Sequence, residues 1–112
     1  FLREQKKELL RRNDTLTLAI YVFYFQIVPV RKGNMLKRQF DSGVKIMERL
    51  IAMGVEQGQF SCEDCRGMAR HIMFVLEGLK ISAQTIGITS EAVDREILFI
   101  MKFLGVIGDN AE

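Results

Sequence analysis

The stretch SCEDCRGMARHIMFVLEGLKISAQT, residues 61–85, decides the fold class, because its apolar positions recur with a helical period over its whole length. Ser61, with Asp64 three positions later, predicts a capped helix start, and Gly87 predicts the helix end. At 100° per residue, one stripe is apolar and is expected to face the core: Cys65, Met68, Ala69, Ile72, Leu76, Leu79 and Ala83. Another stripe is expected to allow close approach of a second helix because several of its residues are small: Gly67, His71, Phe74, Gly78, Ser82 and Thr85.

Four more helices are predicted around this stretch, at about residues 2–12, 15–28, 34–57 and from 90 to 104 or 107. Residues 15–28 (TLTLAIYVFYFQIV) have the composition of a strand and are apolar on every side. We interpret them as a buried helix, because the chain contains no second strand with which they would pair. The sequence therefore predicts an all-α fold of about five helices, in a single domain spanning residues 1–112.

The last predicted helix also has two apolar stripes. Val93, Ile97, Ile100, Met101 and Leu104 are expected to point inward, and Asp94, Arg95, Leu98 and Lys102 are left for solvent. The second apolar stripe consists of Ala92, Phe99, Phe103 and Val106. A domain of 112 residues has no interior large enough to cover both apolar faces of both final helices.

A homodimer solves this problem, because the second faces can meet their copies across a two-fold axis. We expect a four-helix bundle with two helices from each subunit. The predicted interface residues are Gly67, His71, Phe74, Gly78, Ala92, Phe99, Phe103 and Val106. The alternative is that the first helix, or a missing N-terminal segment, covers these faces.

Composition excludes several classes of protein. With 48% hydrophobic and 27% charged residues, the chain is not a disordered tail, and two cysteines cannot form a secreted disulfide framework. Residues 16–30 are too short and too interrupted to span a bilayer, and no signal pattern appears, so we expect a cytoplasmic location and no membrane partner. Residues 1–50 carry eleven Lys/Arg and five Asp/Glu (+6), whereas residues 51–112 carry five and nine (−4), which we attribute mainly to solvated helix faces.

Little in the sequence predicts chemistry. His71 is the single histidine, no catalytic triad can be assembled, and no metal or cofactor site is expected. Cys62 and Cys65 form a C-x-x-C pair at a predicted helix start, a place that lowers thiol pKa values. However, the chain lacks a βαβ unit, and the two intervening acids disfavour a thiolate. We therefore predict no enzyme, and a thiol-redox protein remains the minor alternative.

The last three helices resemble the C-terminal half of TetR-family (tetracycline-repressor-like) transcriptional regulators. The resemblance rests on residues 50–60 (LIAMGVEQGQF), the acidic start at Glu63 and Asp64, and the long helix containing LEGL at 76–79. The short loop, the Ser90 cap and the final apolar helix also fit, and the aromatic residues 19–25 resemble a buried helix of many members. The similarity covers about residues 15–107.

This resemblance implies a dimer made by the last two helices and a small, mostly apolar effector bound among the buried aromatic helix, the third helix and the fourth. Effector binding would then change the DNA affinity of N-terminal helix-turn-helix domains. This chain contains no helix-turn-helix, so we expect DNA contact only through an N-terminal domain outside it. The chain would be the regulatory module.

Large, adaptable side chains expected to point inward are the candidate effector ligands: Tyr21, Phe25, Phe40, Met47, Met68 and Ile72. Because no Lys or Arg is expected among them, the sequence favours a neutral or cationic effector, whose identity stays open. Ordinary core packing explains the same residues. A purely structural dimerisation module without a ligand is therefore the main alternative.

Overall fold

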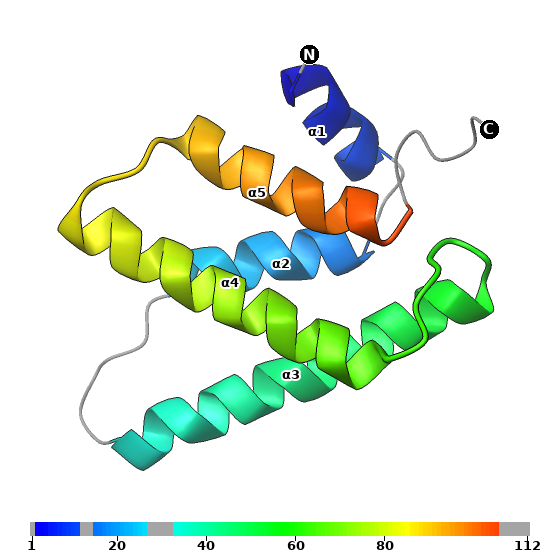
Figure 1. Cartoon of the computed structure of the whole chain (residues 1–112), viewed down its shortest axis with the longest axis horizontal. Coiled ribbons are helices and arrows are strands. Elements are labelled where there is room, and N and C mark those ends of the chain that lie inside the picture. The colour runs from blue at the N-terminus through cyan, green and yellow to red at the C-terminus, as the bar shows by residue number, and fades with distance from the viewer. Residues whose placement is uncertain (1, 12–14, 27–32, 106–112) are drawn as a thin grey trace.

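The computed structural model describes residues 2–11, 15–26 and 33–105, which form five helices and no strand (Figure 1). The all-α prediction is therefore confirmed, including the helical state of the strand-like aromatic segment. That helix ends at Phe25, earlier than predicted. The helices are α1 (Leu2–Arg11), α2 (Thr15–Phe25), α3 (Gly33–Glu56), α4 (Cys65–Thr85) and α5 (Ser90–Phe103).

The start of α5 at Ser90 is as predicted, but the capping residues of two helices differ from those expected. Asp64, rather than Ser61, caps α4, because its Oδ1 accepts a hydrogen bond from the Gly67 amide at 2.9 Å. Thr89, rather than Ser90, caps α5 through the Ala92 amide. In both cases the capping side chain is the one whose oxygen reaches the free amide three positions later. The predicted stop at Gly87 is confirmed, since this residue has φ +79°, which side chains disfavour.

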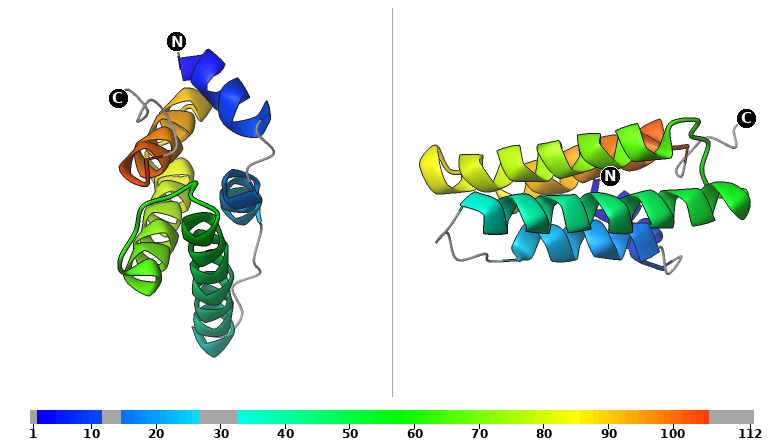
Figure 2. Two further views of the ribbon diagram at one scale, coloured as in Figure 1. Left: turned by 90° about the vertical axis from the view of Figure 1, so that its right-hand side faces the viewer. Right: turned by 90° about the horizontal axis from the view of Figure 1, so that it is seen from below.

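The helices form two layers in a molecule of 47 × 29 × 19 Å. Figure 2 shows α4 and α5 on one side and α2 and α3 on the other. α4 packs against both α3 and α2, whereas α1 packs mainly on α5. The shortest dimension is about two helix diameters, so each layer has an inner and an outer side. None of the described helices combines the length and apolarity that a bilayer crossing requires.

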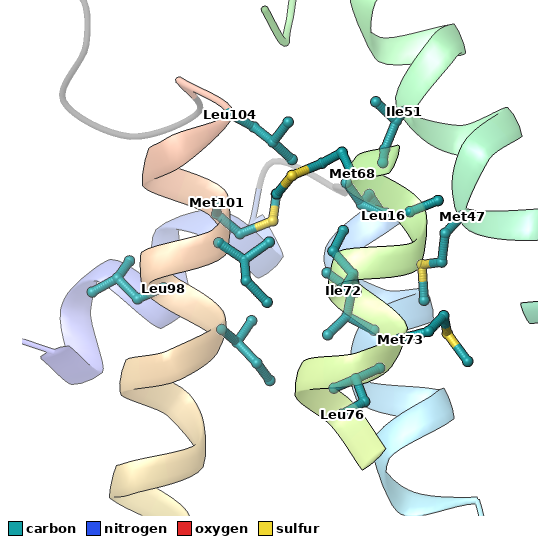
Figure 3. Close-up of a cluster of buried hydrophobic side chains, with 14 of the residues drawn as sticks. Leu16, Met47, Ile51, Met68, Ile72, Met73, Leu76, Leu98, Met101 and Leu104 are labelled. Atoms are coloured by element: carbon teal, nitrogen blue, oxygen red, sulfur yellow. The ribbon is translucent and has the colours of Figure 1, made fainter. Parts of the chain in front are cut away.

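The core lies between these layers and is built largely from branched and sulfur-containing side chains (Figure 3). Leu16 of α2, Met47 of α3, Ile72 of α4 and Met101 of α5 are each no more than 1% exposed. Side chains from four helices therefore meet in one continuous apolar cluster.

The α3–α4 connection is fixed on two sides. A Cβ atom at Gly54 would lie 2.2 Å from Phe60 Cδ2, so the missing side chain makes room for the Phe60 ring on α3. The Ser61 amide donates a hydrogen bond to the Leu104 carbonyl at the end of α5, at 3.1 Å. The C-terminal end of α3, the start of α4 and the end of α5 are thus joined.

α1 covers one side of α5, which the apolar pattern of α5 does not predict. Leu98, expected in solvent, is only 6% exposed, and Asp94 is 17% exposed at its side chain. The reason is α1, which packs on α5. The first helix therefore covers the side of α5 that carries Leu98, while Phe99 and Phe103 stay 59% and 77% exposed.

Candidate functional site

A groove of about 900 Å³ lies between α2 and α3, and most of its lining residues are exposed. It is open to solvent, and its α2 wall includes large apolar side chains such as Val22 and Phe25, which are 65% and 68% exposed. The described residues that line it are Leu18, Tyr21, Val22, Phe23, Phe25, Gln26, Arg38, Gln39, Ser42 and Ile46. Apolar walls with few polar groups are typical of small-molecule sites.

The groove has a polar end and an apolar end. α2 and α3 run antiparallel (Figure 1), so the end of α2 lies near the start of α3. Gln26, Arg38 and Gln39 therefore line the end near the α2–α3 connection. Leu18 and Ile46 line the other end, and the two ends are about 12 Å apart at 1.5 Å per helical residue.

Tyr21 connects the groove to α5 and α1. Its hydroxyl donates a 2.7 Å hydrogen bond to Asp94 Oδ1, and Lys6 Nζ lies 3.2 Å from the same carboxylate oxygen. Lys6 Nζ also lies 5.0 Å from the centroid of the Tyr21 ring. Burial, followed by the hydrogen bond and the charge of Asp94, raises the pKa of Tyr21 well above its ordinary value. The hydroxyl is therefore neutral and committed to Asp94.

The candidate ligand residues do not all meet in one place. Tyr21 and Phe25 line the groove, but Met47, Met68 and Ile72 are 0%, 8% and 0% exposed within the core. Phe40 is half-buried and packs against Phe74 of α4, with ring centroids 5.0 Å apart. The expected position between α2, α3 and the inner side of α4 is thus occupied by the protein's own side chains (Figure 3).

The remaining groove residues were missed from the sequence. The α2 residues Leu18 and Val22 had a usable signal, since they share one helical face with Tyr21 and Phe25. Arg38 and Ile46 had none, because they lie off the main apolar stripe of α3. Only the packing of α2 beside α3 brings them together.

Seven of the eight predicted interface residues lie on α4 and α5, the helices that make up one layer of the molecule (Figure 2). His71, Phe74, Gly78, Ala92, Phe99 and Phe103 are exposed, and Val106 lies outside the described residues. Ile81 of α4 adds a further apolar side chain that is 57% exposed. We call Phe74, Ile81, Phe99 and Phe103 the α4/α5 face.

The two glycines of the predicted interface, Gly67 and Gly78, differ in their surroundings. A Cβ at Gly78 would meet no atom within 4 Å, so this point on the outer side is open. A Cβ at Gly67 would lie 2.2 Å from Asp64 Oδ2, so the helix cap itself requires a small residue there.

The two cysteines are free thiols that lie just before and at the first residue of α4. Burial and the neighbouring Cys65 raise the pKa of the Cys62 thiol, which opposes the thiolate that a redox site needs. Within residues 2–11, 15–26 and 33–105, no group of three or more His, Cys, Asp or Glu side chains is placed to hold a metal ion.

Comparison with known protein families gives a match over most of the chain. A family model described as "Tetracyclin repressor-like, C-terminal domain" matches residues 1–94. This region includes both walls of the groove, the whole of α4 and the first turn of α5. No curated protein and no solved structure compared with the chain gave a match.

Proposed function

Because this chain belongs to the tetracyclin repressor-like C-terminal domain family, we propose that it is the dimerisation and effector-binding module of a transcriptional regulator. Domains of this family generally dimerise and bind small ligands, and the family is regulatory rather than enzymatic. The observation that carries the proposal for this chain is the α4/α5 face, whose four large apolar side chains are 56–77% exposed.

The α4/α5 face supports a homodimer on energetic grounds. Fully burying a large apolar side chain contributes roughly 1.5–3 kcal/mol, and contiguous apolar patches mark interaction surfaces. Phe99 and Phe103 lie one helical turn apart on α5, and the open position at Gly78 allows a helix to approach α4. A two-fold axis would place α4 and α5 of each subunit together as a four-helix bundle.

The groove between α2 and α3 is the proposed effector site. It contains two of the six candidate residues, Tyr21 and Phe25, and it lies in the layer opposite the α4/α5 face. The core offers no such space at Met47 and Ile72, which are fully buried. In this proposal the module acts in the cytoplasm and reaches DNA through an N-terminal domain outside this chain.

Sedimentation velocity of two variants tests the dimer. Phe99→Glu places a charge at a side chain that is 59% exposed on the α4/α5 face. Phe25→Glu is the matched control, since it makes the same change at a side chain that is 68% exposed in the groove. We expect a dimer that Phe99→Glu converts to monomer and that Phe25→Glu preserves. A dimer broken only by Phe25→Glu would place the interface on the groove instead.

A purely structural dimerisation module is the second candidate function. The filled core at Met47, Met68 and Ile72 favours it, because the position where an internal effector was expected is closed. Ligand titration separates the two functions: the structural module binds no small molecule at the groove, yet still dimerises.

A further inference from the structure

The charge at one end of the groove indicates the chemistry of its ligand. Of the ten described residues that line the groove, Arg38 is the single charged one, and its side chain forms no hydrogen bond or ion pair with another described residue. The neighbouring Lys37 is already paired with Asp41, at 3.0 Å. Asp41 does not line the groove, so no described carboxylate at the lining neutralises Arg38.

The neutral polar groups lie at the same end. Gln26 and Gln39 line the groove at the same end as the arginine, and each carries an amide that can donate hydrogen bonds. A groove end with one guanidinium and two amides suits a group with several acceptor oxygens, and an Arg–carboxylate pair is frequently bidentate. This end of the groove therefore favours an anionic head group.

The rest of the groove offers apolar contacts. Leu18 and Ile46 form the far end, where each is just over 40% exposed. Between the ends, Tyr21 presents its ring, because its hydroxyl is held by Asp94 at 2.7 Å. A ligand that reaches from Arg38 to Ile46 thus needs an apolar body roughly as long as the distance between the ends, about 12 Å.

We infer that the α2/α3 groove binds an amphiphilic anion, with its negative head at Arg38 and its apolar chain along Tyr21, Val22 and Ile46. This inference rests on the proposed function and adds the class of effector. It differs from the neutral or cationic ligand that the sequence favours, because Arg38 lies off the main apolar stripe of α3 and reaches the groove only through the packing of α3 beside α2.

Calorimetric titration with three ten-carbon probes tests the inference on the full chain: decanoate, decanol and decyltrimethylammonium, each kept below its aggregation threshold. We expect decanoate to bind most tightly, and to bind more weakly as salt is added, because screening weakens exposed charge pairs. Arg38→Gln is expected to weaken decanoate binding by up to about fivefold and to leave decanol binding unchanged. Arg49→Gln is the matched control, since this exposed arginine of α3 lies outside the groove.

Ile46→Glu separates failure of the inference from failure of the proposed site. This exposed substitution charges the apolar end and is expected to weaken the binding of decanoate and decanol strongly. If decanoate and decanol bind equally, and Arg38→Gln changes neither, the anionic head is wrong, while loss of binding in Ile46→Glu still supports an effector site. If no probe binds the wild-type chain, both the inference and the effector half of the proposed function are wrong.

Discussion

Truncating Ile72 to alanine is expected to destabilise the protein strongly, because this side chain belongs to the filled core. Ile72 is 0% exposed on the inner side of α4. The substitution removes three carbon atoms, which at about 0.8 kcal/mol each amounts to about 2.4 kcal/mol of lost burial. The cavity left behind brings the expected loss of unfolding free energy into the range of about 2–5 kcal/mol. For a domain of this size, that corresponds to a decrease in Tm of roughly 10–20 °C.

Urea unfolding followed by circular dichroism measures this loss, at one fixed protein concentration because dimerisation contributes to stability. Ile46→Ala is the matched control: it removes the same atoms from a side chain that is 43% exposed, and a loss below about 1.5 kcal/mol is expected. If Ile72→Ala costs less than about 1 kcal/mol, the interior is loosely packed. An internal effector cavity would then explain Met47 and Ile72 better than a closed core does.

Three further perturbations test separate contacts. Because the folded state raises the pKa of Tyr21, the unfolded chain loses this proton first, so stability should fall as pH rises above about 10. Tyr21→Phe should remove this alkaline decline in stability, as measured by urea unfolding across that pH range. An unchanged decline would contradict the raised pKa of Tyr21 in the folded state. Gly54→Ala should lower the unfolding free energy by about 1 kcal/mol, because the clash with Phe60 outweighs the gain in helix propensity. An equal or higher Tm for this variant in thermal unfolding would refute the prediction. Asp64→Ala should lower the unfolding free energy by about 1 kcal/mol, because the α4 cap is lost. Asp64→Asn should keep most of this stability in the same assay, because an Asn side chain can also cap the helix.

Helical periodicity predicted much of this fold because α3, α4 and α5 each carry a clear apolar stripe. Ile72 and Met101 were placed inward and are fully buried. The strand-like segment 15–25 was assigned correctly as α2 only by considering the whole chain, since a lone strand has no partner. Local rules were less accurate at helix starts: both Ser61 and Asp64 can cap a helix, and the sequence does not show which one bonds to an amide.

What the sequence could not show is which neighbour covers each face. Leu98 was expected in solvent because nothing in the pattern of α5 predicts that α1 packs there. In the same way, Tyr21 and Phe25 were identified as candidate ligand residues, but the side on which α3 packs determines that they line an outer groove. Arg38 belongs to the site only because two antiparallel helices meet, so a single-helix pattern could not identify it.

The joined end of the bundle limits how the two layers can move. Phe60 on Gly54 and the Ser61–Leu104 hydrogen bond hold α3, α4 and α5 together at one end. No equivalent backbone bond links the described residues at the other end, where the groove carries Arg38. Any relative motion of α3 and α4 would therefore be a rotation about the joined end. α4 is about 30 Å long, so a rotation of roughly 5° would shift its far end by about 3 Å while leaving the joined end almost still.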